Sequence, residues 1–262
     1  MSRDKIFKLS AEEIKDNYDT LIEYIEKYIP SRSNQIIDML EDLGAERLAF
    51  APASSTEYFH NAIPGGDVDH ILRVIKFSIK EMQCFKELGL KIDNFTIEEL
   101  IFAALNHDLG KLGFTGDGNE LYKNNESEWH RNNLGQIYKK NENIPNMPIQ
   151  DRSLFLLQKY SIKCSLNEWI AIRIHDGVFD ESNKSYWINF KLDSKLRSNL
   201  PLIIHNADMK AARFEFERWN EYERKINLNF IDVETNITSN NTINDVIKPE
   251  SLKNSFDKIF GK

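Results

Sequence analysis

Cysteine is scarce in this sequence, and its scarcity argues against a disulfide-based fold. The 262 residues include only two cysteines, Cys84 and Cys164, which lie far apart in the chain. A small secreted scaffold needs several cysteines at close spacing. We therefore expect both thiols to be reduced and the protein to be cytoplasmic.

Long apolar runs and an excess of positive charge are missing as well. No stretch approaches the roughly 20 apolar residues that cross a bilayer as a helix, and the first residues, MSRDKIFKLSAEE, lack the apolar segment of a signal peptide. The formal net charge is -7. Because phosphate contacts dominate general nucleic-acid binding, we predict neither a membrane nor a general nucleic-acid partner. A small phosphorylated substrate stays compatible, since it needs only a local basic pocket.

Helix signals dominate what is present. Hydrophobic residues make up 41% of the chain, which is enough for one sizeable core. Ser127 and Asp67 are expected to cap two helices. Three capping boxes predict further helix starts: Ser10 with Glu13, Thr96 with Glu99, and Ser165 with Glu168. Strand signals are weak, and only YWINFKL near residue 186 could be a short strand or an irregular piece.

The sequence therefore predicts an all-α fold. N-terminal helices over residues 1–50 are expected to pack on the core, where they could also contact a second copy of the chain in a homo-oligomer. The main domain is expected over residues 51–222. An Asn-rich extension with a short C-terminal helix is expected over residues 223–262.

Histidine is rare, and most of the six histidines fall at helix ends. His70 and His130 are expected in first turns, whereas His107 and His175 are expected in last turns, each followed directly by an aspartate. Asp208 interrupts the apolar stretch LIIHNADMKAA. A buried carboxylate is costly unless something positive holds it, and imidazole and carboxylate groups are natural ligands of divalent metals. A single position of this kind is better explained as a polar core residue, but the adjacent pair His107 and Asp108 favours a metal, and so does the ordered set.

This ordered set resembles the HD-domain superfamily of metal-dependent phosphohydrolases, specifically the branch with an H…HD…H…H…D pattern. The matching residues are His70, His107, Asp108, His130, His175 and Asp208. The PGG before His70, the HDLGK turn and Ala207 before Asp208 add to the likeness, which covers roughly residues 60–215. The whole chain is also similar to HD proteins carried by bacteriophages.

The resemblance implies an HD-domain helical bundle around a buried centre of two divalent ions, which would be iron, manganese or magnesium. One ion would be held by His70, His107, Asp108 and Asp208. The other would be held by His130 and His175, with Asp108 bridging the two. A metal-bound hydroxide would then attack the phosphorus of a nucleotide or another small phosphoester, with Asp108 and Lys111 as catalytic residues.

Cations and polar groups near the centre would position the substrate. The candidates are Lys111, Arg73, Arg131, His205 and Lys210, each of which could instead be a solvated charge or a polar core group. Arg213 follows Asp208, Arg173 could have salt-bridge partners on its own helix, Asp176 could orient His175, and His60 could border the pocket. The polar loop over residues 113–129 could form a lid, since such loops tend to move.

Two other functions stay open at this stage. A few proteins with the same ligand set use a mixed-valence di-iron pair to activate oxygen, so an oxygenase is one alternative. A non-catalytic metal-binding HD module is the other. The ligand pattern does not separate these classes from a phosphohydrolase.

Overall fold

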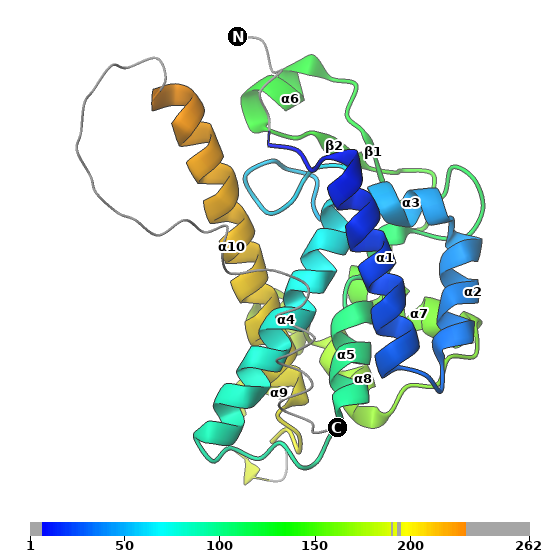
Figure 1. Ribbon diagram of the computed structural model, residues 1–262, viewed down its shortest axis with the longest axis vertical. Coiled ribbons are helices and arrows are strands. Elements are labelled where there is room, and N and C mark those ends of the chain that lie inside the picture. The colour runs from blue at the N-terminus through cyan, green and yellow to red at the C-terminus, as the bar shows by residue number, and fades with distance from the viewer. Residues whose placement is uncertain (1–6, 190, 193–194, 229–262) are drawn as a thin grey trace. The chain divides into compact units, whose positions relative to one another are not determined.

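The computed structural model describes residues 7–189, 191–192 and 195–228 (Figure 1). Side chains are described as far as Tyr222. One compact unit ends at Glu223, and a second begins at Arg224. Most of the predicted C-terminal extension and its short helix therefore lie outside the described residues.

The described part of the chain is mostly helical, as predicted. Its α-helices are α1 (Ala11–Tyr28), α2 (Ser33–Leu43), α3 (Ala45–Phe50), α4 (Gly66–Glu87), α5 (Ile97–Asn106), α6 (Glu128–Leu134), α7 (Ile149–Lys159), α8 (Leu166–Arg173), α9 (Lys184–Trp187) and α10 (Leu200–Leu228). Its 3-10 helices are η1 (Leu109–Leu112), η2 (Gly177–Phe179) and η3 (Glu181–Asn183). Among the described residues, no helix combines the length and the apolar character that a membrane crossing requires.

One short hairpin accompanies the helices of the described residues. Strands β1 (Tyr122–Asn124) and β2 (Tyr138–Lys140) pair antiparallel, with Tyr122 opposite Lys140. The sequence suggested a short strand or an irregular piece near residue 186, where α9 ends at Trp187. Strands of three residues are too short to show an alternating pattern, so periodicity could not reveal this hairpin.

Helix starts follow the predicted capping in most cases. All three capping boxes form in both directions, at the starts of α1, α5 and α8. Ser127 caps α6 by accepting a hydrogen bond from His130 N. The prediction for Asp67 is wrong, because Gly65 is the N-cap of α4 in the left-handed conformation and Asp67 lies buried in the first turn.

Helix α5 forms the centre of the core. Its residues from Leu100 to Asn106 are all buried, and it contacts α4, α8 and α1. The N-terminal helices also contact one another and α4. Because α5 is buried, its C-terminal end delivers His107 and Asp108 into the interior of the unit.

The HDLGK turn that follows α5 is anchored by α7. A Cβ atom at Gly110 would lie 2.1 Å from the carbonyl oxygen of Ile149, so only glycine fits here. Ser153 Oγ accepts a hydrogen bond from Gly110 N at 2.8 Å and donates one to the carbonyl oxygen of His107 at 3.2 Å. The Arg152 guanidinium donates to the carbonyl oxygen of Gly110 at 3.0 Å. Helix α7 therefore fixes the backbone that carries the central aspartate.

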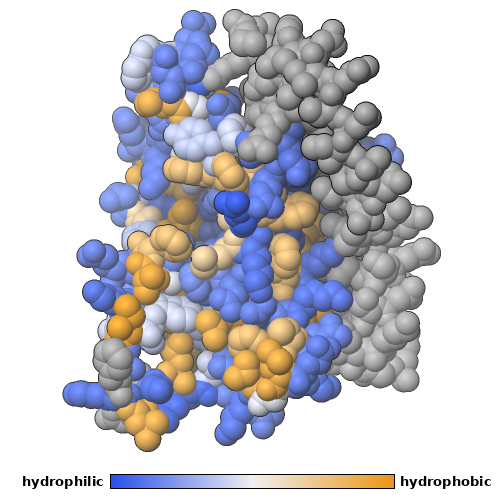
Figure 2. Space-filling model, turned by 90° about the vertical axis from the view of Figure 1, so that its left-hand side faces the viewer, coloured by the Kyte–Doolittle hydropathy of each residue, from blue (hydrophilic) through white to orange (hydrophobic). Residues whose placement is uncertain are grey.

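The surface carries exposed hydrophobic side chains in separate patches. Figure 2 shows orange patches divided by blue hydrophilic residues on the face that it presents. Among the most exposed apolar side chains are Phe179 and Leu192, at 79% and 78%. Single exposed apolar residues are normal on globular proteins and carry no functional argument.

Candidate metal centre

Three imidazoles meet at one place in the interior. His70 comes from α4, His107 from the C-cap of α5 and His175 from the turn after α8. The ring centroids of His70 and His107 are 5.5 Å apart, and those of His107 and His175 are 4.9 Å apart. All three side chains are at most 2% exposed. Residues separated by more than 100 positions in the sequence thus share one buried cluster.

Two carboxylates face these rings. Asp108 Oδ2 lies 3.1 Å from His107 Nε2 and 3.6 Å from His70 Nε2, whereas Asp108 Oδ1 lies 3.7 Å from His175 Nε2. Asp208 Oδ1, from α10, lies 3.1 Å from His70 Nε2 and 3.9 Å from His107 Nε2. Although burial opposes ionisation, the imidazole of His70 holds the pKa of Asp208 below its usual range.

The other nitrogen of each imidazole is already engaged. His107 Nδ1 lies 2.7 Å from the carbonyl oxygen of Ala104, and His175 Nδ1 lies 2.8 Å from that of Ile172. A carbonyl oxygen only accepts, so both Nδ1 atoms must carry the proton. His70 Nδ1 faces the Glu215 carboxylate at 3.1 Å. Each ring therefore directs Nε2 toward the shared space, which is the usual arrangement of metal-binding histidines.

This arrangement fits a metal ion. The Nε2 atoms of His70 and His107 are buried and make no well-directed hydrogen bond to any described residue. Ligand atoms within 4.8 Å of one another occur in three groups, and each group could hold an ion. The groups are His70 with His107 and Asp208, His107 with Asp108 and His175, and His175 with Asp176 and Asp208. Five of the six predicted ligands are therefore brought together.

The sixth predicted ligand, His130, does not join them. It is exposed on α6, a helix of seven residues with no buried side chain. Its Nδ1 lies 2.7 Å from Ser127 Oγ, and its ring packs against Trp129. The carboxylate that lies beside His175 is that of Asp176, with Oδ1 3.5 Å from His175 Nε2. His130 therefore lies on an exposed helix and contacts the Ser127 cap of that helix. The order of histidines in the sequence could not show this position.

Lys111 is the cation that the structure places at the centre. Its ammonium nitrogen lies 2.5 Å from Asp108 Oδ2, and its side chain is only 6% exposed. Although burial favours the neutral amine, the charges of Asp108 and Asp67 hold the pKa of Lys111 above its ordinary value. The lysine side chain and a metal ion would therefore share the same carboxylate.

Arg73 does not reach substrate space, contrary to the prediction. Its guanidinium donates to Glu215 Oε1 at 3.1 Å and to Asp69 Oδ2 at 2.8 Å, and it stacks over the Phe214 ring. Glu215 is fully buried and accepts from both Arg73 and His70. Burial lowers the pKa of His70, but the negative charge of Glu215 and the nearby carboxylate of Asp208 outweigh burial and raise that pKa to about 10. The arginine therefore balances the charge of a carboxylate that orients a ligand.

The remaining predicted cations have partners elsewhere. Arg131 donates to the carbonyl oxygen of Asn125, and Lys210 pairs with Glu81 on α4. Arg213 pairs with Glu217 along the exposed face of α10. Arg173 pairs with Asp151 at 2.9 Å and with Asp180 at 3.4 Å. None of these contacts lies in the imidazole cluster, so only Lys111 keeps its predicted place near the metal site.

His205 supports the cluster through the backbone. Its Nδ1 lies 2.6 Å from the carbonyl oxygen of His175, and its ring lies 5.1 Å from that of Trp187. A Cβ atom at Gly177, whose φ is +59°, would lie 2.3 Å from His205 Cε1. The glycine thus lets His205 close over the turn that presents His175 and Asp176. His205 was predicted to contact substrate or to be a polar core group, whereas its described contacts favour a role in holding the turn that carries His175.

Two further groups lie beside the cluster. The ring of His60 lies 5.0 Å from that of His70, and burial, with the nearby charge of Lys111, lowers the pKa of His60 to about 3. Asp67 is fully buried, and neither carboxylate oxygen has a hydrogen-bond partner among the described residues. Burial raises the pKa of Asp67 to about 7. The sequence predicted that His60 could border the pocket. It gave Asp67 no role beyond that of a helix cap.

We expect Asp67→Asn to stabilise the metal-depleted protein more strongly as the pH rises. The folded-state pKa is about 7, whereas an unfolded aspartate titrates near 3.9. The wild-type protein therefore loses stability as the pH rises from about 4 to about 7, because the carboxyl group ionises in the unfolded protein but stays protonated in the folded protein. Asparagine has no proton to lose. Each unit of pKa difference is worth about 1.4 kcal/mol, so the gain should be about 2 kcal/mol larger at about pH 6.5 than at about pH 5.

Urea unfolding of both proteins at these two pH values, in the presence of a chelator, measures the difference in the free energy of unfolding. An advantage of Asp67→Asn that stays constant with pH would show that Asp67 titrates normally in the folded protein.

Sequence reasoning missed the residues that hold the ligands in place. These residues include Glu215, which contacts a ligand far away in the sequence. Ser153 and Gly177 act through the backbone of the turns that carry the ligands. Only the seven-residue spacing from Asp208 to Glu215, which puts both on one face of α10, gave a local signal.

Comparison of the chain with known proteins found no match. No family model, no curated protein and no solved structure matches it. The likeness to HD-domain proteins therefore remains a resemblance carried by the residues named above. The case for a metal centre depends on the geometry of this chain.

Proposed function

We propose that this protein is a metal-dependent phosphohydrolase that acts on a nucleotide or another small phosphoester. One observation carries the proposal. Three histidines have Nδ1 engaged by fixed acceptors, and their Nε2 atoms converge on the carboxylates of Asp108 and Asp208. A merely structural cluster would have no need to leave two buried Nε2 atoms without hydrogen bonds.

The donor set fits two neighbouring divalent ions. His70, His107 and Asp208 would hold one ion, and His175 and Asp108 would hold the other, with Asp176 close by. Imidazole nitrogen and carboxylate oxygen suit iron and manganese, and carboxylates also suit magnesium. Such ions, when bound, supply a water of lowered pKa and neutralise charge on phosphoryl oxygens.

The chain's own residues would do the rest. Asp108 presents one oxygen toward His107 and the other toward His175, so it can serve both ligand groups. Lys111 holds an ammonium group next to that carboxylate, where it would bind a phosphoryl oxygen. His205 and Glu215 hold their histidines in position and so limit reorganisation during the reaction.

A phosphate-release assay tests the proposal. The full chain would be stripped of metal and assayed against a panel of nucleoside mono-, di-, tri- and cyclic phosphates with Mn²⁺, Mg²⁺ and Fe²⁺. We expect release that depends on added metal and persists without oxygen. Oxygen consumption without phosphate release would favour the oxygenase alternative, and no metal uptake at all would favour a non-catalytic module.

We expect Lys111→Met to tighten metal binding while it weakens catalysis. The ammonium nitrogen lies 2.5 Å from Asp108 Oδ2 and repels any cation held by the same oxygen. Removal of that charge should raise Mn²⁺ affinity by about tenfold, whereas loss of the phosphate contact should lower kcat/KM by about 100-fold. Calorimetric Mn²⁺ titration and steady-state kinetics measure the two effects.

Lys139→Met is the matched control, because Lys139 is exposed on β2. It should change neither quantity. If Lys111→Met lost Mn²⁺ affinity, the lysine would have to support the metal site rather than the substrate.

A further inference from the structure

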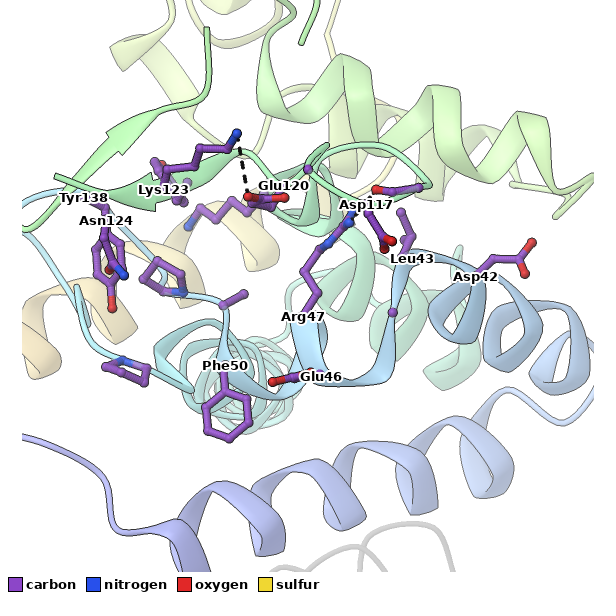
Figure 3. Close-up of a pocket in the computed structure, with 18 of the residues that line it drawn as sticks. Asp42, Leu43, Glu46, Arg47, Phe50, Asp117, Glu120, Lys123, Asn124 and Tyr138 are labelled. Carbon is purple, nitrogen blue, oxygen red and sulfur yellow. Dashed lines mark hydrogen bonds and ion pairs between the residues drawn. The ribbon is translucent and has the colours of Figure 1, made fainter. Parts of the chain in front are cut away.

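A large cavity lies next to Lys111. Its volume is about 870 Å³, within the range of small-molecule sites. Figure 3 shows Glu46 and Arg47 of α3 on one side of it and Glu120 and Lys123 on the other. The loop that was expected to be a lid forms part of its wall, through residues 116–118 and Glu120. The N-terminal helices therefore build a pocket wall and do more than cover the core.

Lys111 connects this cavity to the metal centre. It lines the cavity, and its ammonium nitrogen contacts Asp108 Oδ2 at 2.5 Å. A phosphoryl group that contacts Lys111 from the cavity would therefore lie one side chain away from the proposed bridging carboxylate. Tyr122 lines the cavity beside it. The cavity therefore lies where the organic group of a phosphoester would extend from the phosphate.

The other cations on the cavity wall are already engaged. Arg47 donates to the carbonyl oxygens of Phe114 and Gly116, at 2.5 Å and 2.7 Å. Lys123 pairs with Glu120 at 3.9 Å. Among the described lining cations, Lys111 is the one that pairs with a proposed metal ligand, Asp108. A single ammonium group at this position suits a single phosphate.

The rest of the wall combines acidic and apolar groups. Glu41, Asp42, Glu46 and Asp117 line the cavity and are exposed. Phe50, Tyr122, Tyr138 and two prolines supply flat or apolar surface. Apolar and aromatic walls favour a neutral organic group, and nearby carboxylates repel a second anionic group.

We propose that this cavity binds the organic group of a phosphomonoester, and that its acidic rim selects neutral or cationic groups over anionic ones. This inference rests on the proposed phosphohydrolase function. It narrows the substrate to monoesters such as nucleoside monophosphates. A triphosphate that presented its terminal phosphate to Lys111 would place the other two phosphates among the rim carboxylates.

Three matched aryl phosphates test the charge preference. They are phenyl phosphate, 4-carboxyphenyl phosphate and 4-(trimethylammonio)phenyl phosphate, assayed with the full chain and Mn²⁺. We expect the carboxylate to raise KM by about tenfold relative to phenyl phosphate and the quaternary ammonium to lower it. Adenosine monophosphate should likewise have a lower KM than adenosine triphosphate.

A rim variant makes the test specific to this cavity. Glu46→Gln combined with Asp117→Asn should remove most of the difference in KM between the three esters. Glu12→Gln combined with Asp16→Asn is the matched control, because both residues are exposed on α1 outside the cavity wall. The control should keep the wild-type preference.

Binding of non-hydrolysable analogues separates this inference from the proposed function. Phenylphosphonate and 4-carboxyphenylphosphonate would be titrated into the Mn²⁺-loaded protein by calorimetry. A charge preference that the rim variant abolishes supports the inference even if no ester is hydrolysed, in which case only the hydrolase proposal fails. Equal binding of the two phosphonates, or a preference that the rim variant leaves intact, would overturn the inference.

Discussion

Asp108→Asn and His107→Ala are expected to reduce bound metal to background and to abolish phosphate release. Asp108 is the residue whose two oxygens face different ligand groups, with Oδ2 3.1 Å from His107 Nε2 and Oδ1 3.7 Å from His175 Nε2. An amide keeps the shape but loses the negative charge that a dication requires. His107 occurs in two of the three ligand groups, and it would hold the ion that His70 and Asp208 share, so its removal takes a ligand from that ion.

Metal content after dialysis and kcat/KM measure these effects, and circular dichroism checks that the variants fold. His130→Ala is the decisive companion variant. The sequence predicted His130 to be a ligand, whereas the structure places this residue on an exposed helix. The His130→Ala protein should therefore keep its metal. Metal loss in His130→Ala would restore the sequence-based assignment, and full turnover in Asp108→Asn would remove the proposed centre.

The sequence predicted those features that depend on local order. Capping boxes involve residues three positions apart, so Ser10, Thr96 and Ser165 could be read directly and all three are confirmed. The turn HDLGK was also recognisable, because its five residues are consecutive and are part of the resemblance to HD-domain proteins. The turn requires glycine at position 110 because the carbonyl oxygen of Ile149 lies so close to it. That requirement became visible only with the packing of α7.

The sequence did not predict the roles of charged side chains whose partners lie on other helices. Arg73 and Lys210 have the spacing of phosphate-binding cations, but carboxylates on other helices already pair with them. An ion pair between α4 and α10 joins residues more than 100 positions apart. No periodicity in one sequence reports such a pair, so the sequence favoured Lys111 but could not show that Arg73 and Lys210 are engaged elsewhere.

The pairing between α4 and α10 leads to a second strong expectation. Glu215→Ala should lower the free energy of unfolding by about 3–5 kcal/mol, because it leaves the buried Arg73 guanidinium without one of its carboxylates. It should also weaken metal binding by about 10- to 100-fold, because His70 loses the acceptor that fixes its Nδ1. Glu215 is fully buried and lies 3.1 Å from both Arg73 Nε and His70 Nδ1.

Two companion variants separate the structural effect from the effect on the ligand. Glu217→Ala is the matched control on the same helix, since Glu217 is exposed and pairs only with Arg213 among the described residues; it should change neither quantity measurably. Glu215→Gln keeps an acceptor for His70 Nδ1 but removes the charge that balances Arg73. It should therefore recover most of the Mn²⁺ affinity while recovering little of the stability. If affinity and stability fell in parallel across Glu215→Ala and Glu215→Gln, Glu215 would serve the fold alone, and the orientation of His70 would have to come from its place on α4.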